Sequence, residues 1–370
     1  MLDDFLKIYR GKKVLITGNT GFKGSWMSQW LLNIGADVYG MALEPPTNPS
    51  LFDQLALRKH CKWYDVDIRN YKNVEKVLAE VNPEFVFHLA AQTLIRYSYD
   101  FPYETFETNM MGTVNILEAI RQQRIQTNVI VVTTDKCYEN KEWLYGYRET
   151  DPLGGYDPYS ASKGAVEIIV SSYRRSFFNP SDFEKHGVKL SSVRAGNVIG
   201  GGDWATDRIV PDCIRFLSDN KPIQVRNPGA TRPWQHVLEP VGGYLILGSK
   251  LYSSVQKELE QYCDAFNFGP AILSNRTVQE LVFEVIRNWG SGEINIQKEE
   301  AVHEAQLLNI SIEKAYNLLN WHPVWGFEET VKNTVLWYKE LLEIQDGIIE
   351  LTNFQIKKYM NEFRFTNKTD

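Results

Sequence analysis

The stretch KVLITGNTGFKG, residues 13–24, decides the fold of this 370-residue chain. It opens with a short apolar run of the kind found in buried parallel strands. Gly18, Gly21 and Gly24 then follow at the spacing G-x-x-G-x-x-G. The apolar side chains after the glycines recur at helical spacing, at Trp26, Met27, Trp30, Leu31 and Ile34. The sequence therefore predicts a strand, a glycine turn and a helix.

Each glycine of this turn has a physical reason. The turn must be tight, the backbone must approach a pyrophosphate closely, and the helix must pack near the strand. The N-terminus of the helix offers free N–H groups and a partial positive charge to a phosphate. We therefore expect a dinucleotide to contact Gly18, Thr20, Gly21, Phe22 and Gly24. The alternative is a strand–helix corner that binds no ligand.

Composition excludes several classes of protein. The chain is 43% hydrophobic and 23% charged, with a formal net charge of −6, which favours neither nucleic acid nor an anionic membrane as a partner. No apolar stretch approaches the roughly 18 residues of a membrane span, and the acidic N-terminus MLDDFLKIYR lacks the apolar core of a signal peptide. The cysteines are far apart, so we expect buried thiols, no metal site and a cytoplasmic protein: Cys61, Cys137, Cys213 and Cys263.

The identity of the dinucleotide is predicted from residues 37–43, DVYGMAL, which read as a second strand. An acidic residue at the end of this strand commonly holds the adenosine ribose of NAD, whereas an Arg suits the 2′-phosphate of NADP. Here Met41, Ala42 and Leu43 occupy that place, Glu44 follows directly, and no Arg stands there. NAD is therefore the expected cofactor.

Asp67 and Ile68 follow the next predicted strand, near the expected adenine site. An Asp at a strand end can accept a hydrogen bond from the adenine amino group. Asp67 can instead cap the helix expected over residues 71–81. The spacing favours neither interpretation.

Apolar runs over residues 85–89, 129–133 and 189–194 predict further buried strands, separated by helical segments. This alternation specifies an α/β fold with a Rossmann-type, doubly wound parallel sheet. The first run contains His88, which we interpret as a core histidine. It ends in small residues that let the backbone pass close under a cofactor, so we assign cofactor contacts to Leu89, Ala90 and Ala91.

The chain changes character after Asn197, where turns, Trp and charged residues become more frequent. We therefore expect an NAD-binding domain over residues 1–196, with a returning segment near 231–270. The remaining residues, 197–230 and 271–370, are expected to form a smaller substrate-binding lobe. The tail from Thr352 is expected to be a peripheral helix with a frayed end.

Tyr159 and Lys163 stand four residues apart on one predicted helix and therefore share a face. Thr134 ends the strand before that helix, and ligands of such sheets lie at the carboxyl ends of the strands. A cation beside a tyrosine favours the phenolate, so we expect the pKa of Tyr159 to fall towards that of a working base. Tyr159 would take a proton from a sugar hydroxyl while NAD⁺ accepts the hydride, and Lys163 would hold the nicotinamide ribose. The alternative is an exposed Tyr–Lys pair on an amphipathic helix.

These motifs resemble a known family over nearly the whole chain. Four short motifs resemble those of the extended short-chain dehydrogenase/reductases that act on nucleotide sugars: T-G-x-x-G-F-x-G at 17–24, L-A-A at 89–91, Y-x-x-x-K at 159–163 and R-x-x-N at 194–197. Three runs are similar to those of the 4,6-dehydratases that act on CDP-glucose: TDK at 134–136, NVIGGGDW at 197–204 and RPWQHVLEP at 232–240. The resemblance thus implies CDP-glucose as the substrate.

The resemblance also implies a redox-neutral reaction, in which C4 of the hexose is oxidised, water is lost across C5 and C6, and the hydride returns to C6. Thr134 would hydrogen-bond the C4 oxygen, and a protonated Asp135 would donate to the departing C6 hydroxyl. Relatives that act on dTDP-glucose have a glutamate as the C5 base where this chain has Lys136. Lys136 serves as that base only if burial and nearby cations depress its pKa. It can instead orient Asp135.

The diphosphate of such a substrate requires cations and N–H groups. Arg208 and Arg232 are the candidates, with Asn197 near the phosphates and hexose, and Gln92 near the hexose or the cofactor. The alternative for Arg208 is an ordinary surface position on a helix.

Two other functions fit the same scaffold. A nucleotide-sugar 4-epimerase or reductase would use Tyr159 but has no need of an acid for C6, so Asp135 followed by Lys136 favours a dehydratase. A non-catalytic NAD-sensing protein would usually lack the Tyr159–Lys163 pair. The helices expected from Phe101 and from Tyr159 would suit a four-helix interface, so we expect a homodimer or higher homo-oligomer.

Overall fold

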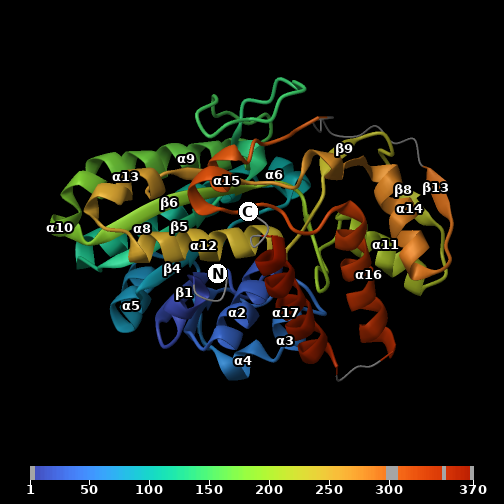
Figure 1. The fold of residues 1–370 in the computed structure, drawn as a ribbon, viewed down its shortest axis with the longest axis horizontal. Helices are drawn as coiled ribbons and strands as arrows, with labels where there is room; N and C mark the ends of the chain where they lie inside the picture. Colours follow the sequence, from blue (N-terminus) through green and yellow to red (C-terminus); the bar gives the residue numbers. More distant parts are fainter. Residues whose placement is uncertain (1–4, 297–306, 344–346, 367–370) are drawn as a thin grey trace.

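A seven-stranded parallel sheet runs through the computed structural model, which describes residues 5–296, 307–343 and 347–366 (Figure 1). Neighbouring strands pair in parallel throughout, in the order β11-β6-β5-β4-β1-β2-β3. The strands are β1 (Lys13–Thr17), β2 (Asp37–Ala42), β3 (Lys62–Asp65), β4 (Phe85–His88), β5 (Thr127–Val132), β6 (Val188–Ala195) and β11 (Ala265–Phe268). The predicted doubly wound sheet is confirmed.

The strand order reverses between β1 and β4. The chain builds β2 and β3 on one side of β1, then crosses to β4 on the other side. Thr17 pairs with His88 where these two strands end. In sheets of this kind the ligand crevice lies outside the carboxyl ends of the strands at such a reversal. The fold therefore directs the glycine turn after β1 and the Leu89–Ala90 segment to one crevice.

Helices cover both faces of the sheet. Because successive side chains of a strand point to opposite sides, each strand contributes residues to two cores. Leu15, Val86 and Val129 form one core with helices α5 (Tyr71–Val81), α8 (Gly112–Gln123) and α9 (Pro158–Ser176). Val14, Ile16, Phe87 and Ile130 form the other core with helices α2 (Phe22–Ile34) and α12 (Leu238–Ser253). All four cysteines are free and buried, as expected.

Caps explain where several helices begin. Asn70 accepts the N–H of Asn73 at 3.2 Å, so α5 spans the predicted residues 71–81. Thr277 and Glu280 form a capping box at the start of α14 (Val278–Trp289). The helix expected from Phe101 is divided: α7 (Pro102–Phe106) and α8 are joined by the π-helical turn η2 (Glu107–Met111).

A second group of elements lies beside the sheet, around α11 (Ile209–Ser218), α14 and α16 (Phe327–Glu343) (Figure 1). Its short strands form three pairs: β7 (Val198–Ile199) with β10 (Gln235–His236), β8 (Ile223–Val225) with β13 (Ile294–Ile296), and β9 (Thr231–Pro233) with β12 (Asn275–Thr277). The remaining helices are α3 (Leu51–Gln54), α4 (Leu57–His60), α6 (Ile95–Asp100), α10 (Phe183–His186), α13 (Leu259–Tyr262) and α15 (Glu313–Leu319). Single 3-10 turns complete the list: η1 (Lys7–Tyr9), η3 (Asp135–Cys137), η4 (Pro180–Asp182), η5 (Gln256–Glu258) and η6 (Ile272–Ser274).

The expectation of a peripheral C-terminal helix is wrong. Helix α17 (Ile348–Thr366) packs against α2 and α16, and Gln355 and Tyr359 are fully buried. The Tyr359 ring meets the ring of Trp30 edge to face, with centroids 5.7 Å apart. The expected frayed end falls partly on residues 367–370, which lie outside the described residues. Within the described ranges, no helix combines the length and apolar character that crossing a bilayer requires.

Candidate active site

The glycine turn has the geometry that its spacing predicts. Gly18 has φ +71°, and a Cβ there would lie 2.8 Å from the backbone of Ala90. A Cβ on Gly24 would lie 2.2 Å from the Gly18 carbonyl oxygen. Gly21 is the N-cap residue of α2, and no side chain caps this helix end. The first-turn N–H groups of α2 therefore face the crevice without a side-chain partner, which fits the pyrophosphate of a dinucleotide.

His88 is a core residue, as expected. Its Nδ1 lies 2.7 Å from Thr17 Oγ1, and its Nε2 lies 3.0 Å from Thr113 Oγ1. Burial, together with the charge of Lys163, lowers the pKa of His88 to about 3. Thr17 Oγ1 also accepts the N–H of Ala90 at 3.1 Å. The histidine is therefore neutral, and it fastens the ends of β1 and β4 beneath the glycine turn.

Asp67 does not cap α5, because Asn70 does. Asp67 accepts the N–H of Arg69 at 2.9 Å and pairs with the Arg69 guanidinium. Asp67 and Arg69 line a hollow beyond β3 together with Asn70 and Glu107. Ile68 is buried, with its Cδ1 against Gly112. The adenine contact predicted for Asp67 and Ile68 stays a prediction.

The end of β2 has a basic neighbour that the local sequence does not reveal. Arg58, fourteen residues after Glu44, pairs with the Glu44 carboxylate. The strand end itself holds no Arg in the sequence, and Arg58 reaches it from α4. Helices α3 and α4 return the chain to the strand, and separation in the sequence hides the contact.

Tyr159 and Lys163 lie at the start of α9, where Asp157 accepts the N–H of Ser160 at 2.9 Å. Tyr159 is 8% exposed and Lys163 is 5% exposed, so the alternative of an exposed pair is wrong. Lys163 Nζ donates to the Val132 carbonyl at 3.1 Å, which ties it to the end of β5. Burial and the nearby charge of Lys23 lower the pKa of Lys163 to about 8.

The expected fall in the pKa of Tyr159 does not occur in this structure. Burial raises the pKa of Tyr159 to about 12, and the charge of Asp135 adds to that rise. A hydrogen bond with Thr134 and the charge of Arg208 act in the opposite direction. The physical reason is that desolvation of the phenolate outweighs the attraction of nearby cations.

Thr134 and Asp135 lie side by side at the end of β5. Thr134 Oγ1 donates to Asp135 Oδ1 at 3.0 Å. Asp135 is 2% exposed, and its Oδ2 has no hydrogen-bond partner among the described residues. A Cβ on Gly196 would come within 3.0 Å of that oxygen. Burial raises the pKa of Asp135, and the charges of Lys136, Arg232 and Lys23 and the hydrogen bond with Thr134 oppose that rise.

Lys23 is the residue near this centre that the sequence analysis missed. It occupies the variable position before Gly24, on the first turn of α2. Burial, together with the charge of Arg208, lowers the pKa of Lys23 to about 8, whereas Asp135 raises it. Lys23 acts electrostatically on both Asp135 and Lys163. The signal in the sequence was a charged side chain inside an otherwise uncharged, glycine-rich turn.

The predicted substrate-binding residues differ in their surroundings. Arg208 precedes α11, where its Nη1 lies 2.9 Å from Asp203 Oδ2 and its charge reaches Tyr159. Arg232 is 4% exposed, and its charge acts on Asp135. Asn197 is half-buried just after β6. The Gln92 amide donates to Leu94 O at 3.1 Å in its own loop and to Thr105 Oγ1 at 2.9 Å on α7.

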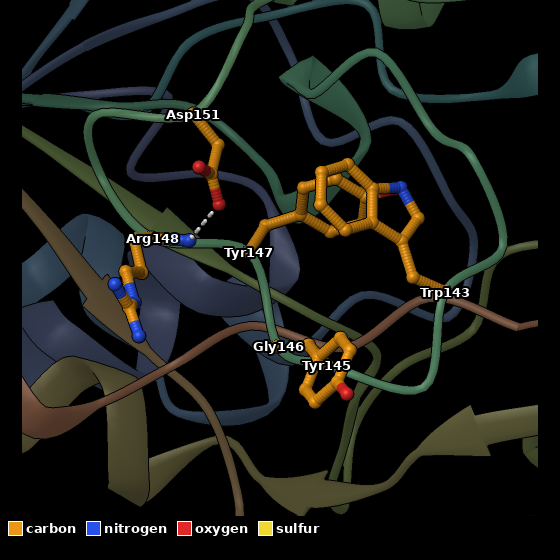
Figure 2. Close-up of a pocket in the computed structure, with 6 residues that line it drawn as sticks. All are labelled: Trp143, Tyr145, Gly146, Tyr147, Arg148 and Asp151. Atoms are coloured by element: carbon orange, nitrogen blue, oxygen red, sulfur yellow. Dashed lines mark hydrogen bonds between the residues drawn. The ribbon is translucent and has the colours of Figure 1, made fainter.

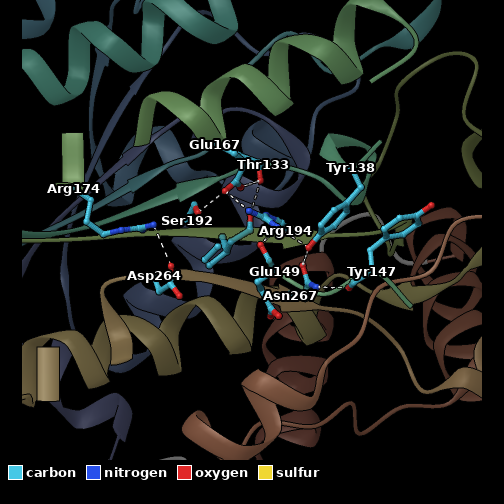
Figure 3. Close-up of polar contacts among 12 residues, drawn as sticks. Thr133, Tyr138, Tyr147, Glu149, Glu167, Arg174, Ser192, Arg194, Asp264 and Asn267 are labelled. Atoms are coloured by element: carbon cyan, nitrogen blue, oxygen red, sulfur yellow. Dashed lines mark hydrogen bonds and ion pairs between the residues drawn. The ribbon is translucent and has the colours of Figure 1, made fainter. Parts of the chain in front are cut away.

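Arg194, from the R-x-x-N motif, has a structural role beneath this site (Figure 3). Its Nη2 lies 2.8 Å from Glu167 Oε2 in a buried ion pair, and its Nη1 donates to the Tyr138 hydroxyl at 2.7 Å. Thr133 and Ser192 also donate to Glu167. This network joins β5, β6 and α9, the elements that hold Thr134 and Tyr159.

The long connection between η3 and α9 forms a separate hollow (Figure 2). Arg148 N donates to Asp151 Oδ2 at 2.7 Å where the connection turns back. Trp143, Tyr145 and Tyr147 supply aromatic rings to its lining. None of the predicted site residues lines this hollow.

Comparisons with known proteins agree with this arrangement. The family model described as GDP-mannose 4,6 dehydratase matches residues 15–334. The chain belongs to that family. It is 46% identical over 354 residues to the CDP-glucose 4,6-dehydratase of Salmonella typhimurium, covering 95% of this chain and 97% of that protein.

Solved structures confirm the fold of this family member. An epimerase from Methanothermobacter thermautotrophicus superposes with a TM-score of 0.77 at 21% identity, covering 93% of this chain and 97% of that one. The dTDP-glucose 4,6-dehydratase of Streptomyces venezuelae, solved with NAD and TYD bound, superposes with a TM-score of 0.74 at 20% identity, covering 88% and 97%.

Proposed function

We propose that the chain is an NAD-dependent CDP-glucose 4,6-dehydratase, which converts CDP-D-glucose to CDP-4-dehydro-6-deoxy-D-glucose. The identity of 46% along nearly the whole length of the Salmonella enzyme supports the substrate. The observation that carries the chemistry is the buried Asp135, whose free Oδ2 lies on the same strand end as Thr134, beside Tyr159. An epimerase needs no such acid, so this feature favours a dehydratase over the alternatives.

NAD fits the crevice between β1 and β4, because Gly18 and Gly24 let the turn pack tightly against Ala90 and onto itself, and because no side chain caps the N-terminus of α2. Bound there, NAD would supply the oxidant that accepts the hydride from C4 and, in its reduced form, the donor that returns the hydride to C6. The turn residues Gly18, Thr20, Gly21, Phe22 and Gly24 would hold the pyrophosphate. Leu89, Ala90 and Ala91 would pass beneath the dinucleotide, and Asp67 and Ile68 would bind its adenine.

Two groups would handle the oxygen and proton at C4. Tyr159 would accept the proton of the C4 hydroxyl, and Thr134 would hydrogen-bond the same oxygen. Burial raises the pKa of Tyr159 to about 12, and the hydrogen bond with Thr134 and the charge of Arg208 oppose that rise. Lys163 would hold the nicotinamide ribose from its place at the end of β5.

Elimination of water would use Asp135 and Lys136, the two residues that follow Thr134. A C4 ketone acidifies the C5 proton, Lys136 would remove that proton, and Asp135 would protonate the departing C6 hydroxyl. When the hydride is returned to C6, the protonated Lys136 would give a proton back to C5. Burial keeps the Asp135 carboxyl suited to donate a proton. Arg208, Arg232 and Asn197 would bind the diphosphate and hexose, and Gln92 would contact the hexose or the cofactor.

The domain division follows the same proposal. Residues 1–196 and the returning segment near 231–270, which includes β11, would form the NAD-binding domain. Residues 197–230 and 271–370 would form the substrate-binding lobe. The free, buried cysteines fit a cytoplasmic protein.

Exposed apolar side chains on α6, α7, η2 and α9 support a homodimer. Tyr103 is 78% exposed, Ile168 is 60% exposed and Met111 is 50% exposed. Their elements are neighbours, because α7 and η2 both pack beside α9. A surface of this composition favours association with a second copy.

The direct test incubates the purified chain and NAD with CDP-glucose, dTDP-glucose, UDP-glucose and GDP-mannose in parallel. The expected result is the alkaline absorbance of a 4-keto-6-deoxy sugar with CDP-glucose. Product from another nucleotide sugar and none from CDP-glucose would overturn the substrate assignment. Conversion of CDP-glucose to an epimer without dehydration would overturn the reaction.

A further inference from the structure

The turn GGGDW, residues 200–204, follows β7 and is held by two helices. The Tyr338 hydroxyl, on α16, donates to the Asp203 carbonyl at 2.6 Å. The Trp26 indole N–H, on α2, donates to the Gly201 carbonyl at 2.9 Å. Both aromatic side chains are buried, so neither hydrogen bond competes with bulk water. The backbone of the turn therefore has a fixed place between α2 and α16.

The carboxylate of Asp203 holds the guanidinium of Arg208, which lies five residues further along the chain. Asp203 is 4% exposed, and its Oδ2 lies 2.9 Å from Arg208 Nη1. Asp207 is adjacent to Arg208 in the sequence, but it pairs with Arg226 at 3.1 Å instead. Among the described residues, the carboxylate that pairs with Arg208 is therefore that of Asp203.

Arg208 connects this turn with elements on the other side of the crevice. Its Nη2 donates to Thr93 Oγ1 at 3.3 Å, in the loop that follows β4. Its charge also acts on Tyr159 at the start of α9 and on Lys23 at the start of α2. A guanidinium has five N–H donors, so the bonds to Asp203 and Thr93 leave others for a phosphate.

We propose that Asp203 is a positioning residue, which holds the Arg208 guanidinium where the diphosphate of the nucleotide sugar binds. The inference rests on the proposed function, which assigns a diphosphate contact to Arg208, and Asp203 itself does not touch the substrate. An arginine side chain has many rotamers, and a buried carboxylate on a fixed turn selects among them. The negative charge of Asp203 acts in the opposite direction, because it reduces the attraction between the site and an anion. The proposal requires that the gain from ordering Arg208 exceeds this electrostatic loss.

Equilibrium binding of CDP to the full-length chain, supplied with NAD and measured by calorimetry, separates these two effects without turnover. Wild type would be compared with Asp203→Asn, Arg208→Met, Asp203→Asn/Arg208→Met and Asp219→Asn. We expect Asp203→Asn to weaken CDP binding by about tenfold, because Arg208 loses its fixed partner. A carboxylate that only neutralised Arg208 would give tighter binding when it is removed. The double variant should bind CDP as weakly as Arg208→Met alone, because the two residues act as one unit.

Steady-state kinetics with CDP-glucose provide a second readout. Arg208 would contact the diphosphate in the ground state and in the transition state alike, so Asp203→Asn should raise KM while kcat changes less. A variant that had only lost part of its folded population would show a lower kcat at an unchanged KM. That pattern would overturn the positioning role, and circular dichroism would verify that each variant is folded.

Asp219→Asn is the matched control, because Asp219 pairs with Lys221 at the C-terminal end of α11. The charge change is the same, and CDP affinity should stay unchanged. Unchanged or tighter CDP binding in Asp203→Asn, or a further loss in the double variant, would overturn the role of Asp203. If wild type bound UDP or GDP in place of CDP, the substrate assignment would fail, and the same comparison with that nucleotide would still decide the inference. Binding of none of the three nucleotides would overturn both.

Discussion

The Tyr359 hydroxyl donates a hydrogen bond of 2.8 Å to Glu239 Oε2, and both residues are fully buried. The other Glu239 oxygen accepts the N–H groups of Val324 and Trp325 at 2.9 and 2.7 Å. Glu239 belongs to α12 against the sheet, whereas Tyr359 belongs to the C-terminal helix α17. One carboxyl group therefore connects the core of the sheet, the segment before α16 and the end of the chain.

This connection predicts a pH-dependent contribution to stability. Burial raises the pKa of Glu239 from 4.5 to about 7. Between those values the folded state binds more protons than the unfolded state, so the free energy of unfolding falls as pH rises towards 7. Glu239→Gln removes this titration. We expect the melting temperature of the variant relative to wild type to rise between pH 5 and pH 8, measured by thermal denaturation, and a constant difference would contradict the prediction.

Replacement of Asp135 by Asn should stop the reaction after the first step. The amide cannot protonate the departing C6 hydroxyl, whereas oxidation at C4 needs only Thr134, Tyr159 and Lys163. We expect formation of the 4-keto-6-deoxy product to fall by about 10²–10⁴-fold, the usual contribution of a general acid. Absorbance of reduced cofactor should accumulate during a single turnover with CDP-glucose. Equal loss of the reduced-cofactor signal and of product would contradict the assignment to elimination.

Exchange of the C5 proton with solvent distinguishes the roles of the two lysines near Asp135. If Lys136 is the C5 base, Lys136→Met should abolish deuterium incorporation at C5 from D₂O, measured by mass spectrometry of the product. Lys23→Met is the matched control, because it removes a cation that acts on Asp135 from a different element, α2. Unchanged incorporation in Lys136→Met would sink the base assignment, and loss only in Lys23→Met would transfer it to Lys23.

The sequence was sufficient for features that depend on local pattern. The glycine spacing after β1 predicts the turn because φ at Gly18 and the close contact of Gly24 admit no side chain. The four-residue spacing of Tyr159 and Lys163 predicts a shared helix face for the same local reason. Continuous apolar runs were enough to predict β1, β4, β5 and β6 and the parallel sheet, but not the edge strand β11.

Other features depend on residues that are distant in the sequence, or on the balance between opposing contributions to a pKa. The contact of Arg58 with Glu44 arises from the path of α3 and α4, which no short motif encodes. Burial of α17 depends on partners such as Glu239, far away in the sequence. The direction of the Tyr159 pKa shift required knowing that desolvation exceeds the effect of nearby charges. The extent of burial of Tyr159, and therefore the size of its desolvation, is known only from the folded structure.

The proposed dimer surface predicts a charge-sensitive assembly. Ile168 on α9 is 60% exposed, and an introduced carboxylate there would be desolvated between two copies without a partner. We expect Ile168→Glu to convert a dimer into a monomer, measured by light scattering at several concentrations. Ile272 in η6 is 75% exposed and lies outside the proposed surface, so Ile272→Glu is the matched control and should leave the mass unchanged. A mass that is insensitive to Ile168→Glu, or equally sensitive to both changes, would place the interface elsewhere.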